Sequence, residues 1–210
     1  MKLASQSIQD QQPINGQFAF CIPNDKSHVC LGSNLSPQFS WTDAPAGTQS
    51  FALLCVDPDV PSVGDNVNIE GRDVAADLPR VDFHHWVLID LPADTQGIET
   101  GLYSKEVTPC GKAGPGAPLG ARQGINDYTV WFAGDADMRG DYYGYDGPCP
   151  PWNDLRVHRY VFTLYALDVP KLELSGKFTG PEVLAAMTGH ILDQASITGT
   201  YTLNKALRFA

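Results

Sequence analysis

The stretch Gly144–Asp168 reads GYDGPCPPWNDLRVHRYVFTLYALD, and its two halves predict different backbone structures. The segment Pro148–Pro151 holds three prolines and one cysteine. Because proline fixes its φ angle and lacks an N–H group, this segment predicts a stiff corner, called the proline corner below. The half that follows, 158–168, is largely apolar on both faces of a period-two pattern. Such a pattern is typical of a central strand in a buried sheet or sandwich.

Short apolar runs of this kind recur along the chain and alternate with turn residues, which indicates a mostly β protein. The chain has 20 glycines and 16 prolines, and they are spread along its length. Strands are expected over the ranges 17–22, 50–57, 84–91, 128–132, 158–168 and 199–204.

One helix is predicted over 179–196. Thr179 is a suitable N-cap, and Glu182 three residues later completes a capping box. Pro181 falls in the first turn, where its missing N–H costs nothing. Helical spacing predicts a buried face made of Leu184, Met187, Thr188 and Ile191.

Residues 1–210 are expected to form a single domain, because no segment repeats at a fixed period. Two long connections, 62–82 and 105–127, interrupt the strand pattern, which resumes immediately after each of them. Connections of this length are uncommon in compact domains and often serve a site or an interface. Surface loops without a function are the alternative, which the sequence leaves open.

The net charge of the chain limits which classes of partner it is expected to bind. The chain has 14 basic and 24 acidic residues, which gives a formal net charge of −10. A field of this sign repels nucleic acid and anionic membranes, so neither is expected as a nonspecific partner. No apolar run approaches the ~20 residues of a membrane span, and the first 16 residues lack the apolar core of a signal peptide. A cytoplasmic location is therefore expected.

The five cysteines do not form a recognisable motif, because their number is odd and no CxxC pair occurs. Neither a cysteine zinc site nor a disulfide framework is indicated. Packed free thiols are the favoured interpretation, and a single disulfide stays open as the alternative.

Three polar positions are placed by strand geometry. Asp57 ends a predicted strand in DPDVP, where the following prolines hold the backbone extended. Strict alternation puts His158 and Tyr160 on one face of their strand. It places His85 with Val87, Ile89 and Leu91, and His84 with Trp86 and Leu88. A histidine and a phenol beside a rigid corner can both donate hydrogen bonds to a small anion.

Several common chemistries lack their sequence motifs. There is no GxSxG nucleophile elbow, no GxxxxGK[ST] phosphate loop and no HExxH zinc motif. Two histidines and Asp57 could form a two-histidine, one-carboxylate iron site, but no local spacing supports one. No cofactor and no metal is therefore expected.

Four segments together resemble the phosphatidylethanolamine-binding protein family, and in particular its bacterial branch of Raf-kinase-inhibitor-like proteins. They are SPQFSWTDAPAGTQSFALLCVDPDVPS, HHWVLIDLP, GYDGPCPPWNDLRVHRYVFTLYALD and GHILDQASITGTYTLN. The DPDxP box, the HW strand and the GPCPP…HxY block are specific in this order and at these separations. The resemblance covers about 36–204.

The resemblance implies an antiparallel β-sandwich with a few peripheral helices and one small-anion pocket. In eukaryotic members that pocket takes the phosphate of a phosphoethanolamine headgroup. It also implies a cis peptide bond at Val60–Pro61. Carried over to this sequence, the ligand-binding residues are Asp57, Asp59, His85, Gly147, Pro148, Pro150, Pro151, His158 and Tyr160.

These residues suggest how an acidic protein could hold an anion. A carboxylate between two histidines should raise their affinity for a proton, and protonated imidazoles donate strong hydrogen bonds. The favoured interpretation is a non-enzymatic binding protein that recognises a phosphate or carboxylate group and modulates a partner protein or kinase. Two alternatives are an enzyme that uses His85, His158 and Asp57 for acid–base or metal chemistry, and a structural homodimer formed through exposed sheet edges.

Overall fold

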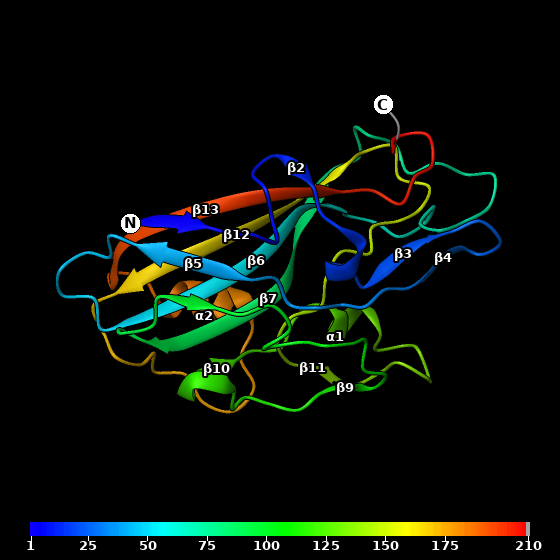
Figure 1. Cartoon of the computed structure of the whole chain (residues 1–210). Coiled ribbons are helices and arrows are strands. Elements are labelled where there is room, and N and C mark those ends of the chain that lie inside the picture. Colours follow the sequence, from blue (N-terminus) through cyan, green and yellow to red (C-terminus); the bar gives the residue numbers. More distant parts are fainter. Residues whose placement is uncertain (209–210) are drawn as a thin grey trace.

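A six-stranded sheet forms the centre of the computed structural model, which describes residues 1–208 (Figure 1). Its strands lie in the order β10–β7–β6–β12–β13–β2. The four long strands pair antiparallel, and β12 pairs with both of its neighbours, which confirms the predicted central strand. The strands are β2 (Gln12–Pro13), β6 (Ser50–Pro61), β7 (Arg80–Pro92), β10 (Arg122–Gln123), β12 (His158–Leu167) and β13 (Ile191–Tyr201).

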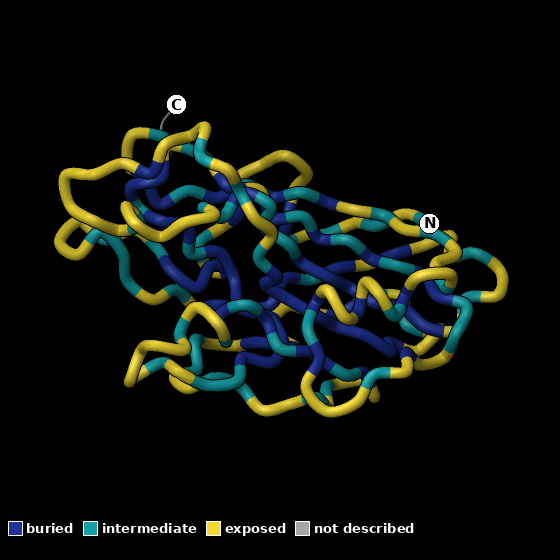
Figure 2. Tube along the Cα trace, turned by 180° about the vertical axis from the view of Figure 1, so that it is seen from behind, coloured by how far each residue is buried: buried dark blue, intermediate teal, exposed yellow. Residues whose placement is uncertain are grey.

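A three-stranded sheet covers one face of the central sheet and completes a sandwich. It is made of β1 (Lys2–Ala4), β5 (Phe39–Thr42) and β8 (Gly97–Ile98). The ring of Phe39 lies 5.1 Å from that of Phe162, and Trp41 lies 5.4 Å from Phe51, between centroids. The predicted class, a mostly β sandwich with few helices, is therefore confirmed. Buried backbone runs through the middle of the molecule, and exposed residues gather in its connections (Figure 2).

The helix α2 (Gly180–Ala186) covers the other face of the central sheet, and its capping box between Thr179 and Glu182 is formed as predicted. The predicted length is wrong, and of the predicted buried face Met187 alone is buried. Gly189 has a φ of +86°, which ends the helical segment, and the chain continues as β13. The buried side chains of α2 are Val183 and its neighbour Met187, whereas the predicted Leu184 and Ile191 are each 41% exposed.

The predicted strand 128–132 is instead the single helical turn α1 (Tyr128–Trp131). Helical spacing explains the difference, because Tyr128 and Phe132 stack on each other with centroids 5.5 Å apart. Val130 and Trp131 are 75% and 52% exposed. Packing of the i and i+4 rings has overridden the strand preference of this aromatic, β-branched run.

The remaining elements are short. The predicted strand 17–22 divides into a 3₁₀ turn, η1 (Gly16–Phe18), and β3 (Cys21–Asn24), which pairs with β4 (His28–Leu31). The long 105–127 connection carries β9 (Gly111–Lys112), η2 (Pro118–Gly120) and β10. Further along the chain, β11 (Asp141–Tyr142) pairs with β9.

The strand β6 extends further than predicted, through Pro61, and Val60 pairs with Val81 across the sheet. The expected cis bond at Val60–Pro61 is wrong, because within residues 1–208 the cis peptide is Gly114–Pro115. An extended strand needs the trans peptide to stay in register. Among the described residues, no helix has the length and apolar character needed to span a membrane.

Candidate functional site

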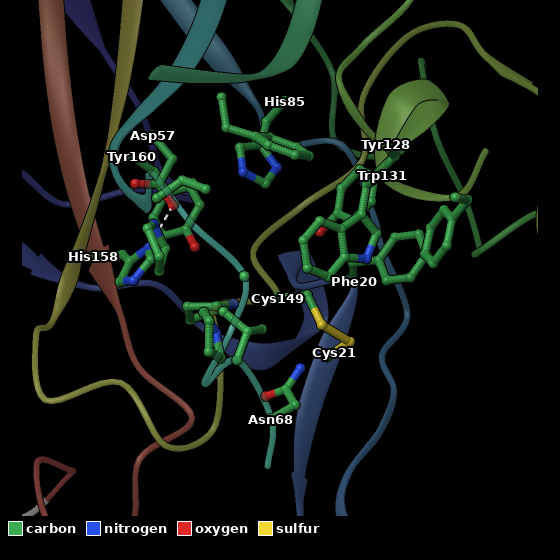
Figure 3. A pocket seen from close by; sticks show the side chains of 18 of the residues that line it. Phe20, Cys21, Asp57, Asn68, His85, Tyr128, Trp131, Cys149, His158 and Tyr160 are labelled. Carbon is green, nitrogen blue, oxygen red and sulfur yellow. Dashed lines mark hydrogen bonds and ion pairs between the residues drawn. A yellow bond between two sulfur atoms is a disulfide. The ribbon is translucent and has the colours of Figure 1, made fainter. Parts of the chain in front are cut away.

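A pocket of about 320 Å³ opens where β6, β7 and β12 meet the proline corner. Polar side chains gather on one side of the pocket and aromatic side chains on the other (Figure 3). The polar group is Asp57, His85, His158 and Tyr160. The apolar walls include Phe20, Val63, Val67, Phe83, Tyr128, Trp131, Phe132 and Met138.

His158 lies between two carboxylates at the start of β12. Its Nδ1 is 2.7 Å from Oδ2 of Asp57, and its Nε2 is 3.1 Å from Oδ2 of Asp154. Burial disfavours the imidazolium, but the hydrogen bonds to Asp154 and Asp57 outweigh burial and raise the pKa of His158 to about 9. Both ring N–H groups are therefore donated to carboxylates, and neither is free to bind a ligand.

Asp154 was not among the predicted site residues, although it completes this arrangement. Arg80, the first residue of β7, donates to both of its carboxylate oxygens, at 2.5 and 3.0 Å. Burial alone would raise the pKa of Asp154, but the bonds from His158 and Arg80 hold it below its usual value. Asp154 and Arg80 are 74 residues apart, so no local pattern could have shown that they pair.

The imidazole of His85 points into the pocket (Figure 3). Its Nδ1 is 2.7 Å from the carbonyl oxygen of Asp146, and a carbonyl only accepts, so Nδ1 carries a proton. Nε2 has no hydrogen-bond partner within residues 1–208 and is an acceptor while the ring is neutral. Burial lowers the pKa of His85, and the opposing effect of Asp57 does not overcome it. The expected rise in proton affinity is thus right for His158 and wrong for His85.

Asp146 is itself held in place by a buried polar network. Its Oδ1 accepts from Nζ of Lys112 at 2.6 Å and from Asn34 at 2.7 Å, and its Oδ2 accepts from Asn126 at 2.8 Å. These bonds fix the carbonyl to which His85 donates. The network therefore sets which nitrogen of His85 faces the pocket.

A β-bulge in β7 brings His85 to the pocket. Cys55 of β6 pairs with Trp86 of β7, and the next residue of β6, Val56, pairs with His84. The pairing therefore skips one residue of β7. His85 is the extra residue between these pairs, and a bulge of this kind re-aims a side chain.

The two histidines do lie on opposite faces, but their expected neighbours are reversed. The ring of His85 lies 5.1 Å from that of Tyr160, on the sandwich side where Trp86 is buried. His84 packs against Gly180 at the start of α2, where an added Cβ would lie 1.9 Å from its ring. Strict alternation failed because it allows no extra residue in the strand.

The hydroxyl group of Tyr160 has no hydrogen-bond partner within residues 1–208, and the residue is 1% exposed. The Asp57 carboxylate lies close enough to affect the pKa of the phenol, but the contact does not have the geometry of a hydrogen bond. Burial and the charge of Asp57 raise its pKa well above the usual value, so the phenol keeps its proton. Tyr160 is therefore a buried donor aimed into the pocket.

Asp59 lies outside the pocket, contrary to the prediction. Its Oδ2 accepts from Nε of Arg159 at 2.8 Å, and its Oδ1 accepts from Arg156 at 3.1 Å. Burial opposes ionisation, but the arginine bonds keep the pKa of Asp59 below its usual value. Because both oxygens are occupied by arginines, the role of Asp59 is to fix the end of β6.

Gly147 and Pro148 also lie behind the pocket wall rather than in it. The N–H of Gly147 is donated to Oδ1 of Asn34 at 2.8 Å, and the carbonyl of Pro148 accepts from the Cys21 N–H at 3.1 Å. Gly147 is required there, because an added Cβ would lie 2.0 Å from the carbonyl of Phe18. The corner therefore reaches the pocket through Pro150 and Pro151, as predicted for those two prolines.

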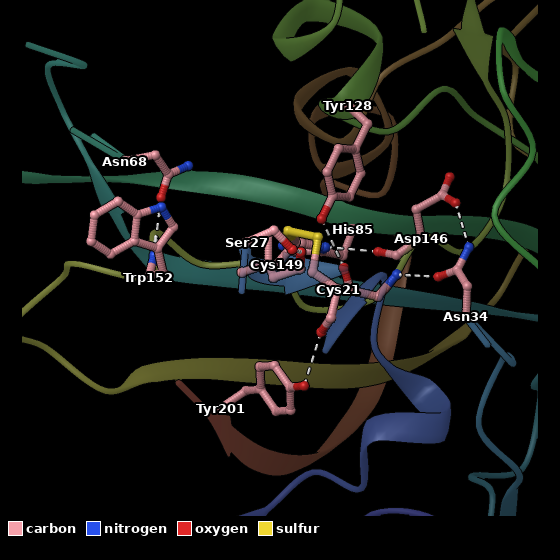
Figure 4. The surroundings of a disulfide bond; sticks show 12 residues. Cys21, Ser27, Asn34, Asn68, His85, Tyr128, Asp146, Cys149, Trp152 and Tyr201 are labelled. Carbon is pink, nitrogen blue, oxygen red and sulfur yellow. Dashed lines mark hydrogen bonds between the residues drawn. A yellow bond between two sulfur atoms is a disulfide. The ribbon is translucent and has the colours of Figure 1, made fainter. Parts of the chain in front are cut away.

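A disulfide joins Cys21 of β3 to Cys149 of the proline corner and forms part of the pocket wall (Figure 4). The favoured expectation of free thiols is wrong for this pair. Cys30, Cys55 and Cys110 are free as expected, but of the three Cys55 is buried, Cys30 is half-buried and Cys110 is exposed. The paired cysteines are 128 residues apart, so spacing gave no signal of their contact.

The connection Ser62–Pro79 forms another wall, through Val63 and Val67 among others. Asn153 attaches it to the proline corner. The Nδ2 of Asn153 donates to the carbonyls of Asn66 and Arg72, both at 2.8 Å, and its Oδ1 accepts from the Asn68 N–H at 2.9 Å. The long connection therefore lines the candidate pocket, whereas the sequence left open whether it serves a site.

The described part of the chain holds no group of three histidine, cysteine or acidic residues arranged to bind a metal. The suggested iron site fails for a specific reason. Both ring nitrogens of His158 already face carboxylates, so neither is free to bind a metal.

Known proteins with similar sequences share nearly the whole of this chain. A family model described as phosphatidylethanolamine-binding protein matches residues 4–202. A UPF0098 protein of Methanothermobacter thermautotrophicus is 36% identical over 174 residues, covering 83% of this chain and 87% of that protein. The UPF0098 protein YbhB of Escherichia coli is 30% identical over 202 residues, covering 96% and 100%.

Solved structures agree with this likeness. The crystal structure of Escherichia coli YbcL, described as a member of the mammalian PEBP family, matches with a TM-score of 0.68 at 24% identity, covering 96% of this chain and 97% of that one. A phosphatidylethanolamine-binding protein homologue of Chlamydia trachomatis matches with a TM-score of 0.63 at 28% identity, covering 95% of each chain. From the family model and the shared fold, the chain belongs to the phosphatidylethanolamine-binding protein family.

Proposed function

We propose that this chain is a non-enzymatic binding protein whose pocket takes the oxyanion group of a ligand, a carboxylate or a phosphate. The observation that carries the proposal is the buried hydroxyl of Tyr160, which has no partner within residues 1–208. Buried polar groups are nearly always hydrogen-bonded, so a ligand oxygen is its natural partner. The Nε2 of His85 faces the same space and becomes a second donor once it is protonated.

The proposed consequence of binding is the modulation of a partner protein or kinase that presents or senses the ligand. Nucleic acid is not proposed as a partner, because the net charge of −10 opposes it. Acid–base catalysis is not proposed either. His158 is held protonated between Asp57 and Asp154 and cannot act as a proton acceptor at neutral pH.

Titration calorimetry at pH 6 with acetate and with phosphate tests the proposal. We expect saturable binding of at least one of them, weakened about tenfold or more by Tyr160→Phe, since a hydrogen bond to a charged group contributes about 1.5–3 kcal/mol. Tyr145→Phe is the matched control, because Tyr145 is also fully buried but donates to the carbonyl of Phe18. Absence of saturable binding, or equal weakening by both variants, would contradict the proposal.

The cytoplasmic location stays a prediction, and the Cys21–Cys149 disulfide makes it testable. Disulfides persist mainly in oxidising compartments. Alkylation of free thiols in intact cells, followed by mass spectrometry, shows whether Cys21 and Cys149 are paired where the protein resides. Reduced cysteines in the cell would agree with the cytoplasm, and paired ones would argue for an oxidising compartment.

A further inference from the structure

The charged groups at the polar end of the pocket cancel each other. Asp57 and Asp154 are matched by His158 and Arg80, which form one connected chain of ion pairs. Asp146, behind His85, is matched by Lys112 at 2.6 Å. The pocket therefore offers no spare positive charge to an incoming anion.

Other groups also face His85 from the elements packed around it. They are the phenol of Tyr160 on β12, the phenol of Tyr128 on α1, and Asp127, whose carboxylate lies 3.3 Å from Nδ1 of His84. The hydroxyl of Tyr128 is already donated to the carbonyl of Gly147 at 2.9 Å. Of these groups, only Tyr160 has a proton to offer a ligand.

A neutral His85 presents the lone pair of Nε2, which repels an oxyanion. An oxyanion can bind there only if one proton arrives with it, either on the ligand or on Nε2. One proton compensates the charge of a monoanion, whereas a dianion leaves one negative charge uncompensated in a buried site. Burying an unpaired charge is costly, so the geometry favours a carboxylate over a phosphate dianion.

The rest of the pocket is far larger than a carboxylate group and is apolar. Its aromatic wall is built on Phe20 and Tyr128, which stack with ring centroids 4.5 Å apart (Figure 3). Trp131, which is 52% exposed, lies beside them at the rim, and Val63 and Val67 come from the connection. A ligand that fills this space has an apolar or aromatic body attached to its polar head.

We propose that the ligand is an amphiphilic monocarboxylic acid with an apolar or aromatic body, bound together with one proton shared with His85. This inference rests on the proposed oxyanion site and narrows it to one class of ligand. It assigns two roles: Tyr160 donates to one carboxylate oxygen, and His85 holds the proton against the other.

Four probes test this inference: acetate, phenylacetate, inorganic phosphate and phenyl phosphate. Titration calorimetry at pH 7.5 in buffers of different ionisation enthalpy measures both affinity and proton uptake. We expect phenylacetate to bind at least about tenfold tighter than acetate, because its ring enters the aromatic wall. We also expect it to bind tighter than phenyl phosphate, with uptake of about one proton. Its affinity should fall about tenfold per pH unit between pH 6.5 and 8.5.

His85→Gln keeps a donor near the position of Nε2 but cannot titrate in this range, so proton uptake should disappear. His84→Gln is the matched control, because His84 faces α2, and it should keep wild-type uptake. Circular dichroism shows whether each variant is folded. If His85→Gln does not fold, the number of protons that the wild-type protein takes up with phenylacetate tests the inference by itself.

The outcomes separate this inference from the proposed function. Tighter binding of phenyl phosphate, or binding of phenylacetate without proton uptake, would overturn the inference while leaving an oxyanion site in place. Failure of all four probes to bind would overturn both. Equal affinity for acetate and phenylacetate would show that the apolar walls do not contact the ligand, and would also overturn the inference.

Discussion

At the scale of single residues, the site depends on how each histidine is bonded. His158 and His85 lie in the same pocket, and their pKa values move in opposite directions. His158 donates to two carboxylates and its pKa rises, whereas His85 donates to a neutral carbonyl and burial lowers its pKa. The identity of the acceptor, and not the presence of a nearby acid, decides the charge of each ring.

The raised pKa of His158 predicts a loss of stability at alkaline pH. The folded state holds this proton more tightly than the unfolded state, so its stabilisation is fully present below about pH 6.5 and is lost as pH rises towards 9. The free energy of unfolding should fall by on the order of 3 kcal/mol over this range, since one pKa unit corresponds to about 1.4 kcal/mol. The lowered pKa of His85 acts in the opposite direction, but its unfolded imidazole is largely neutral above pH 7.5, so the fall between pH 7.5 and 9 comes from His158. Urea unfolding at pH 6.5, 7.5 and 9 measures the change.

The variant His158→Gln should lose this pH dependence and be less stable at pH 6.5, because it leaves two buried carboxylates without their shared cation. His190→Gln is the control. His190 is 43% exposed in its side chain and pairs with Asp168 at the surface, where ion pairs contribute little. A pH dependence that persists unchanged in His158→Gln would contradict this assignment.

The unpartnered hydroxyl of Tyr160 predicts an unusual response to its removal. Tyr160→Phe should leave the free energy of unfolding unchanged or raise it, because a buried donor without a partner costs stability. Tyr145→Phe should lower it by about 1 kcal/mol or more, since it breaks the 2.6 Å bond to the carbonyl of Phe18. Thermal unfolding of both variants without ligand makes the comparison. An equal loss in the two would mean that Tyr160 has a protein partner after all.

At the scale of elements, irregularities in regular strands build the site. The bulge at His85 turns one histidine of the HHW sequence into the pocket and leaves the other against α2. The single turn of α1 supplies Tyr128 and Trp131 to the aromatic side of the pocket from a run that favours a strand. Both features depend on what packs against the segment and not on its own composition.

The connection Ser62–Pro79 should loosen when Asn153 is replaced. Asn153→Ala removes a buried side chain and leaves its partners in the exposed connection, including two carbonyls and one N–H, without these hydrogen bonds. We expect faster amide exchange across the connection and about 2 kcal/mol lower stability. Hydrogen exchange with mass spectrometry measures the first, and urea unfolding the second.

Asn66→Ala is the matched control for this change, because its side chain only accepts from the exposed Arg72. It should leave exchange in the connection close to that of the wild-type protein. Exchange in Asn153→Ala that matches this control would show that backbone packing alone holds the wall.

At the scale of the whole molecule, one covalent link ties the N-terminal hairpin β3–β4 to the proline corner. The Cys21–Cys149 disulfide closes a loop of 128 residues, and a link of this span restricts the unfolded chain strongly. Cys21→Ser with Cys149→Ser should lower the free energy of unfolding by about 2–5 kcal/mol and the Tm by about 5–15 °C. Calorimetry with and without a thiol reductant measures both effects.

Cys110→Ser serves as the control, because Cys110 is exposed and unpaired. It should change the Tm by little, and it should keep the sensitivity of the wild-type protein to reductant. If reductant lowers the Tm of the double variant as well, then the Cys21–Cys149 disulfide is not the source of the effect.

The suggested homodimer stays a prediction, which light scattering in solution tests directly.

The sequence by itself determined the strands β6, β7 and β12, the capping box and the family, because these depend on local pattern and on motifs in a set order, whereas most of β13 was predicted as helix. Alternation of apolar residues identifies β12 wherever its partners lie, and proline stiffens the corner without tertiary help. The family resemblance, and not the strand pattern, placed Asp57 and His158 in one pocket, although they lie 101 residues apart in the sequence.

Only the tertiary structure decided which atoms of the site are free. Asp154 and Arg80 meet His158 from distant segments, Asp59 is taken by two arginines, and Cys21 reaches Cys149 across 128 residues. A hydrogen bond is used or available only once every neighbour is in place, and contacts between remote segments leave no periodic trace in a sequence. The residues around the pocket could therefore be predicted, but the donors that remain for a ligand could not.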